Sequence, residues 1–112
     1  MSRDEAFLRH ILDEIKFLSE RCGRLEFSEL MDDEVLKRAC VRSLEVIGEA
    51  VKNLSEDFKE RNPEVEWKKI AGLRDKLIHR YFGVDWDIVW DIIKNKLPDL
   101  EEKIRKLIEK EL

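Results

Sequence analysis

Residues 32–58 read DDEVLKRACVRSLEVIGEAVKNLSEDF, and the apolar residues in this stretch recur every three or four positions. That spacing follows the period of an α-helix, so one face of the segment is apolar and the opposite face is charged. Asp32 is a suitable N-cap, and Asn62 with Pro63 ends the pattern. The stretch therefore predicts a long amphipathic helix, whose buried stripe is Leu36, Cys40, Leu44, Ile47, Val51, Leu54 and Phe58.

Two further helical patterns flank this one. Ser2 followed by Glu5 matches a capping box, and apolar residues then recur at helical spacing until Gly23. After the long helix, a third helical segment is expected to begin near Glu66 and to run to about Tyr81. The short segment between the first two helices, which contains Phe27, is expected to be a loop.

A fourth pattern fills the remainder of the chain. Gly83 supplies a stop signal for the third helix, and Asp85 can cap the next one. Pro98 interrupts the fourth pattern, with lysines before it and acidic residues after it, so we expect a kink or a break there. Four main helices with short connections predict an all-α fold, an antiparallel four-helix-type bundle.

Length and composition agree with a single domain spanning residues 1–112. The chain has 22 Lys and Arg against 26 Asp and Glu, and 43% of its residues are hydrophobic, which is enough to fill one core. No stretch longer than four residues lacks a charge, which excludes a membrane span and the apolar part of a secretory signal. We therefore expect a cytoplasmic protein.

The cysteines do not suggest a metal site. Cys22 and Cys40 are 18 residues apart without a CxxC spacing, and the only other soft ligands are His10 and His79. These residues cannot form a zinc site within one chain, so we expect two small buried hydrophobic side chains and neither a metal nor a cofactor.

One segment is strongly basic although the chain as a whole has a net charge of −4. Residues 67–82 read WKKIAGLRDKLIHRYF, in which five basic residues stand against Asp75 alone, a local charge of +4 that leaves −8 on the remainder. Such a segment suggests an anionic partner, whereas composition alone favours an ordinary solvated helix face. The basic residues are Lys68, Lys69, Arg74, Lys76 and Arg80.

Arg74 and His79 together suggest RNA cleavage. A histidine can remove the proton of a ribose 2′-hydroxyl, and an arginine can stabilise the charge that grows on the attacked phosphate, without a metal ion. On an ideal helix the two side chains would point about 140° apart, whereas Asp75 would lie one turn before His79 and could orient its ring. A twofold dimer would bring two copies of each group around one cleft and so supply an acid for the leaving 5′-oxygen.

The same residues resemble a known family. Residues 74–81, RDKLIHRY, match the Arg-x4-His-x-Tyr motif of the HEPN superfamily, specifically of the HepT-like toxins that are encoded beside a minimal nucleotidyltransferase antitoxin. Residues 42–50, RSLEVIGEA, resemble the family's second-helix segment, and residues 67–85 resemble its signature stretch. The resemblance covers nearly the whole chain.

The resemblance implies an all-helical homodimer that acts as a metal-independent endoribonuclease, with Arg74 and His79 at a cleft between the subunits. It also implies that the partner nucleotidyltransferase neutralises the toxin by transferring AMP onto Tyr81. Glu49 could hold the guanidinium of Arg74, although an ordinary surface acid is about as plausible. Asp75 is a second supporting candidate, while phosphate attraction is expected of Lys68, Lys69, Lys76 and Arg80.

Two other functions stay open at this point. The chain could be a non-catalytic helical subunit that binds a nucleotide or RNA for its nucleotidyltransferase partner, or a plain helical dimerisation module. The tryptophans do not decide between them, since Trp67, Trp86 and Trp90 could stack on bases but more often belong to a core or an interface.

Overall fold

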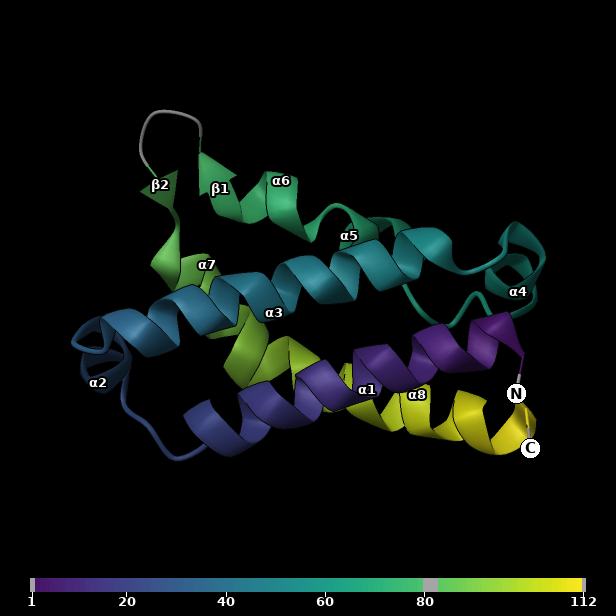
Figure 1. The fold of residues 1–112 in the computed structure, drawn as a ribbon, viewed down its shortest axis with the longest axis horizontal. Helices are drawn as coiled ribbons and strands as arrows, with labels where there is room; N and C mark the ends of the chain where they lie inside the picture. Colours follow the sequence, from purple (N-terminus) through teal and green to yellow (C-terminus); the bar gives the residue numbers. More distant parts are fainter. Residues whose placement is uncertain (1, 80–82, 112) are drawn as a thin grey trace.

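The computed structural model describes residues 2–79 and 83–111 as a helical bundle with one pair of two-residue strands (Figure 1). The two long helices α1 and α3 run antiparallel side by side, and α8 packs against α1 (Figure 1). The all-α prediction is therefore confirmed. In chain order the elements are α1 (Arg3–Cys22), α2 (Phe27–Met31), α3 (Glu34–Asn53), α4 (Glu56–Arg61), α5 (Trp67–Ala71), α6 (Leu73–Leu77), β1 (Ile78–His79), β2 (Gly83–Val84), α7 (Trp86–Asp91), the π-helical turn η1 (Ile92–Lys96) and α8 (Leu97–Glu111).

Side-chain caps define where the first helices begin. The Ser2 hydroxyl accepts a hydrogen bond from the Glu5 amide at 3.0 Å, and α1 ends before Gly23, as predicted. The cap of α3 is Asp33 and not Asp32, because the carboxylate of Asp33 accepts from the Leu36 amide at 2.9 Å. Both carboxylate and hydroxyl satisfy amides that lack a partner in the first helical turn.

The long predicted helix is divided in two, and a short helix precedes it. α3 ends at Asn53, since the Ser55 hydroxyl accepts from the Phe58 amide at 3.1 Å and so starts α4. Asp4 at the start of α1 accepts from both the amide and the hydroxyl of Ser55, at 2.8 Å each. The apolar stripe continues across this break. The expected loop around Phe27 instead holds α2, which is capped by Glu26 and Glu29.

The third predicted helix is shorter than expected. It is divided at Gly72 into α5 and α6 and ends at Leu77, where the chain enters β1 and not a further helical turn. β1 and β2 pair antiparallel, with Ile78 opposite Val84 and His79 opposite Gly83. Gly83 has a φ of +77°, a conformation that favours glycine over other residues. The prediction of a helix through Tyr81 is wrong at Ile78 and His79, which form β1. Tyr81 itself lies outside the described residues.

The π-helical turn η1 lies just before Pro98. The Leu97 amide donates to the Ile92 carbonyl, five residues earlier, directly before the proline. Proline has no amide hydrogen, so the regular hydrogen-bond ladder cannot continue through it, and one wider turn is a common accommodation. The chain changes direction between α7 and α8 (Figure 1), so the expected irregularity is a π-helical turn and not a complete break.

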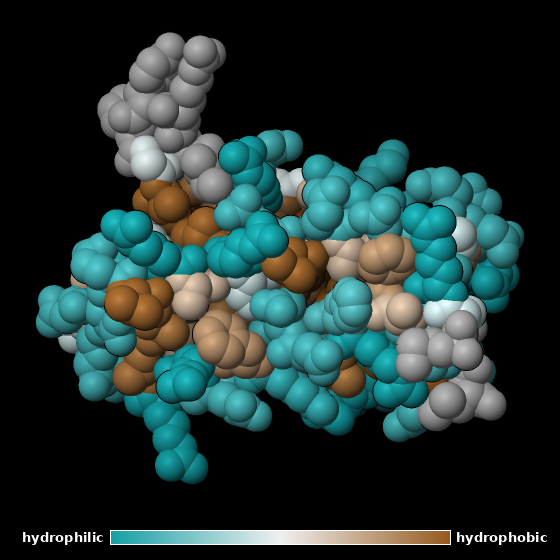
Figure 2. All heavy atoms as spheres, in the orientation of Figure 1, coloured by the Kyte–Doolittle hydropathy of each residue, from teal (hydrophilic) through white to brown (hydrophobic). Residues whose placement is uncertain are grey.

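The core is one connected cluster of buried aliphatic and aromatic side chains that draws on all the helices. The predicted stripe of the second helix lies within it from Cys40 onward, whereas Leu36 is partly buried and packs against it. Leu44, Ile47 and Phe58 are almost completely buried. Hydrophilic residues cover most of the face in Figure 2, with scattered apolar residues over α1 and α3. Val35, in the first turn of α3, is 80% exposed.

Candidate functional site

Arg74 lies on α6, where it contacts an acid of α3. Its Nε donates to Glu45 Oε2 at 3.1 Å, across 29 residues of sequence. The arginine side chain is 62% exposed and that of Glu45 is 29% exposed, so the pair contributes at most about 1 kcal/mol to folding. In the part of the chain that the structure describes, this contact uses Nε alone, so the two terminal guanidinium nitrogens of Arg74 can still donate to an anion.

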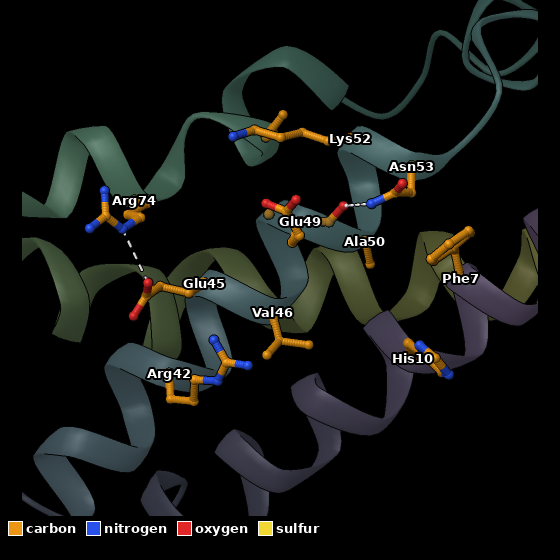
Figure 3. A pocket seen from close by; sticks show the side chains of 12 residues that line it. Phe7, His10, Arg42, Glu45, Val46, Glu49, Ala50, Lys52, Asn53 and Arg74 are labelled. Atoms are coloured by element: carbon orange, nitrogen blue, oxygen red, sulfur yellow. Dashed lines mark hydrogen bonds and ion pairs between the residues drawn. The ribbon is translucent and has the colours of Figure 1, made fainter.

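A groove of about 340 Å³ runs beside this pair, between α1, α3 and the α5–α6 segment. Figure 3 shows Arg74 and Glu45 at one end of it and His10 and Phe7, from α1, at the other. Arg42 and Lys52 add two more cations, so the lining places three cations beside the acids Glu45 and Glu49, together with the aromatic ring of Phe7. The lining also includes Val46, Gly48, Glu49, Ala50, Asn53 and Ala71.

Gly48, which lines this groove, allows the backbone of α5 to approach α3 closely. A Cβ at this position would lie 3.2 Å from the Ile70 carbonyl oxygen and 3.4 Å from that of Ala71. Both neighbours are backbone atoms, which cannot move aside as a side chain can. The close approach brings α6, which follows directly, within reach of Glu45 on α3.

His79 lies in β1, the first strand of a short hairpin. Its side chain lies outside the part of the chain that the structure describes. The Asp85 amide donates to the Leu77 carbonyl at 2.8 Å and closes the base of the hairpin. Leu77 is buried, and the Asp85 carboxylate caps α7 by accepting from the Ile88 amide at 3.2 Å. The hairpin is thus fixed at both ends to packed helices. Because His79 lies in β1, the expected i, i+4 relation to Asp75 on one helix does not apply.

Of the two predicted supporting acids, Glu49 lines the groove and Asp75 does not. Asp75 is exposed on α6, and Glu49 lines the groove one helical turn after Glu45, which is the acid that contacts Arg74. Arg80, predicted to attract phosphate, and Tyr81, the predicted site of AMP transfer, lie outside the described residues.

The three predicted phosphate-attracting lysines of the described segment lie on other surfaces. Lys68 and Lys69 line a hollow between α4 and α5, while Lys76 lines one against α7 and α8. Lys69 also pairs with Glu66 at 2.6 Å, and the pKa of Glu66 lies below its ordinary value because Lys69 hydrogen-bonds the carboxylate. These lysines would therefore attract a phosphate from outside the groove that Arg74 lines.

The tryptophans occupy structural positions. Trp67 is buried and its indole N–H donates to the Asn62 carbonyl at 2.9 Å. Trp86 and Trp90 are partly buried, and each lies under a lysine ammonium, that of Lys37 at 5.1 Å and that of Lys94 at 4.6 Å from the ring centroid. The core alternative is therefore correct for Trp67.

Sequence reasoning missed four groups that line the groove: Arg42, Glu45, Lys52 and His10. The signal was present on α3, because Arg42, Glu45, Glu49 and Lys52 recur at helical spacing and share one face. His10 carried no such signal, since only the packing of α1 against α3 brings it to the groove.

Within residues 2–79 and 83–111, no three metal-ligating side chains are grouped as a metal site would require. The helices of the described ranges also include none with the length and apolar character needed to cross a membrane.

Comparison of the sequence with known proteins identifies a family. The family model described as "Ribonuclease HepT-like" matches residues 11–107. A protein of Caldanaerobacter subterraneus subsp. tengcongensis, named as a proposed RNase, is 50% identical over 99% of both chains. A second, from Methanocaldococcus jannaschii, with the same kind of name, is 48% identical over 92% of this chain and 85% of its own.

A protein of Thermococcus cleftensis whose name proposes it as ribonuclease HepT is 41% identical over 90% of this chain and 92% of its own. No solved structure matches the chain. The extent of the family match and the coverage of these relatives lead to one conclusion: the chain belongs to the HepT-like ribonuclease family.

Proposed function

We propose that this protein is a metal-independent endoribonuclease and the toxin of a toxin–antitoxin pair. The observation that supports the activity best is the groove, which is lined by the exposed guanidinium of Arg74 and by Arg42 and Lys52. The hairpin that carries His79 begins directly after the helix of Arg74. The relatives named for ribonucleases give the class of substrate.

The proposed reaction is an in-line transfer within the RNA chain. His79 removes the proton of a ribose 2′-hydroxyl, whose oxygen attacks the adjacent phosphorus, and the bond to the 5′-oxygen breaks. Arg74 donates to the phosphoryl oxygens as their charge grows. The leaving 5′-oxygen takes a proton from a second imidazolium, so the products carry a 2′,3′-cyclic phosphate and a 5′-hydroxyl.

A second copy of the chain would provide that imidazolium. The face of α1 and α3 in Figure 2 carries scattered apolar groups. Among the apolar side chains of these two helices, Phe7 lines the groove, Phe17 is partly buried and Val35 is exposed. Val46 lines the groove itself. We propose that this face joins two copies about a twofold axis.

Solution mass tests the dimer. The protein is expected to have twice the mass of one chain, and Val46→Glu, which places a charge in the contact, is expected to give monomers that remain folded. Lys110→Glu, a charge change near the end of α8, serves as the matched control and should leave the mass unchanged. A wild-type monomer at micromolar concentration contradicts the proposed dimer.

RNA cleavage tests the activity. Purified, unmodified protein should cleave RNA in the presence of a chelator and leave 2′,3′-cyclic phosphate ends. Arg74→Ala is expected to lower kcat by about 10²–10³, since it removes a donor to the developing oxyanion, and His79→Ala is expected to abolish cleavage. Normal cleavage by both variants, or no cleavage by wild type, would instead favour the non-catalytic helical subunit that binds RNA or nucleotide for a nucleotidyltransferase.

Neutralisation by the partner is the remaining part of the proposal. A nucleotidyltransferase would transfer AMP from ATP to the Tyr81 hydroxyl with release of pyrophosphate, placing bulk and negative charge two residues from His79. Intact-mass measurement after incubation with the partner and ATP should show one AMP on wild type and none on Tyr81→Phe. An AMP that remains on the phenylalanine variant rejects this site.

A further inference from the structure

Two cysteine side chains meet where α1 ends and α3 begins. Cys22 is the last residue of α1, Cys40 lies in the second turn of α3, and their Sγ atoms are 3.6 Å apart. Both thiols are free, and neither residue is exposed to solvent. The sequence offers no reason to pair them, and the proposed cleavage reaction uses neither.

We propose that Cys22 and Cys40 are a disulfide-forming pair, which a small disulfide oxidant such as oxidised glutathione converts into one intrachain bond between α1 and α3. A disulfide requires an Sγ–Sγ distance of about 2 Å, so the sulfurs must approach by roughly 1.6 Å from their present separation. The two thiols already face each other from adjacent antiparallel helices, so this approach requires only a small adjustment of side chains and helix ends.

The surroundings of the pair favour Cys22 as the attacking sulfur. The pKa of the Cys22 thiol is lowered, first because the Cys40 thiol hydrogen-bonds it and then because Lys94 is nearby, against the opposing effects of burial and Asp33. Lys94 is held in place, since its ammonium donates to the Gly23 carbonyl at 2.9 Å. The same hydrogen bond and burial raise the pKa of Cys40. A thiolate is the nucleophile in disulfide exchange, so Cys22 reacts first.

The exchange has two balanced steps. The Cys22 thiolate attacks one sulfur of oxidised glutathione, a mixed disulfide forms, and one glutathione thiolate leaves. Cys40 then loses its proton and attacks Cys22 Sγ, which releases the second glutathione. Two protein thiols are oxidised and one glutathione disulfide is reduced to two thiols.

The bond would join the two ends of a 17-residue segment, residues 23–39, that contains α2 and the Asp33 cap of α3. Closing this segment restricts the unfolded chain more than the folded one, so the oxidised protein is expected to unfold at a temperature higher by roughly 10 °C. Neither cysteine lines the groove of Arg74, so this inference does not depend on the proposed ribonuclease activity.

The test measures thiols and mass in glutathione redox buffers. Native protein is incubated in oxidising buffer, and in a second arm the protein is refolded in it, so that burial cannot keep the reagent out. Samples are then denatured and alkylated. We expect a chain of monomer mass that has lost about 2 Da and carries no alkyl group, and its two thiols should return with reductant. Formation in either arm supports the pair, whereas two alkylated thiols in both arms, or only intermolecular bonds, overturn it.

Variants separate the disulfide from other effects of oxidant. Each single variant removes the hydrogen bond between the two thiols, so the difference that remains is the nearby Lys94, which lowers the pKa of Cys22. Cys40→Ala should therefore retain glutathione on Cys22, while Cys22→Ala should take up glutathione several-fold more slowly at Cys40. The reverse order contradicts the assignment of Cys22 as the attacking thiol. The double variant Cys22→Ala with Cys40→Ala should show no oxidant-dependent change in its unfolding temperature. If it shows the same increase as wild type, the disulfide is not its cause.

Discussion

At the scale of single residues, the structure identifies Glu45 as the partner of Arg74. The carboxylate holds Nε and so limits the rotation of an exposed side chain, while the terminal nitrogens can still donate to an anion. Glu49 lies one turn further along the same face of α3 and lines the same groove. The two acids therefore form a natural pair for comparison.

Glu45→Gln is expected to lower kcat for RNA cleavage by about tenfold, because it removes the charge that orients Arg74, while its effect on unfolding stays within about 1 kcal/mol. Steady-state kinetics and urea unfolding measure the two quantities. Glu49→Gln is the matched control and should change kcat less than twofold. Equal losses in the two variants would show that the acids act only through the groove's overall charge.

At the scale of elements, the close packing of α5 against α3 positions α6 and the hairpin. Gly48 permits that packing, because the atoms opposite it are backbone carbonyls of Ile70 and Ala71. The hairpin then follows from the buried Leu77 and from the bond between the Leu77 carbonyl and the Asp85 amide. A disturbance between α3 and α5 should therefore reach both Arg74 and His79.

Gly48→Ala is expected to destabilise the protein by about 1–3 kcal/mol, since the added methyl forces two helix backbones apart. Gly72→Ala is the control. Its Cβ would lie 3.4 Å from its nearest neighbour, the Lys68 carbonyl, and its φ of −89° suits alanine, so its stability should change by less than about 1 kcal/mol. Urea denaturation measures both, and equal stabilities would contradict the packing role of Gly48.

At the scale of the whole molecule, charge is distributed unevenly on an acidic chain. The net charge is −4, yet Arg42, Lys52 and Arg74 line one groove, and Lys68, Lys69 and Lys76 lie on the surfaces beside it. A polyanion responds to this local potential more than to the total charge. RNA affinity should therefore depend strongly on salt.

The logarithm of the RNA-binding constant is expected to fall linearly with the logarithm of salt concentration, with a slope of about −0.7 for each phosphate neutralised on a single strand. Arg42→Ala should weaken binding for all RNA sequences alike and reduce the slope by about 0.7. Lys110→Ala, near the chain's end, should leave the slope unchanged. Fluorescence anisotropy at several salt concentrations measures this slope. An unaltered slope for Arg42→Ala would show that Arg42 does not contact an RNA phosphate.

The apolar periodicity of the sequence determined the helical class, most of the core and the approximate places of the caps, because these depend on residues within a few turns of one another. The chemistry of the side chains, read from the sequence, also identified Arg74 and His79 as candidates. The apolar periodicity did not determine where helices end when a distant contact competes. Ser55 is tied to Asp4, and the segment after Leu77 pairs with Gly83–Val84, so two predicted helices were too long.

Only the tertiary structure decided which distant side chains meet. The contact of Arg74 with Glu45 spans 29 residues, that of Cys22 with Cys40 spans 18, and His10 reaches the groove from another helix. Spacing along one helix predicts which residues share its face, but not which face of another helix lies opposite. That choice depends on how the apolar stripes pack together, a property of the whole core.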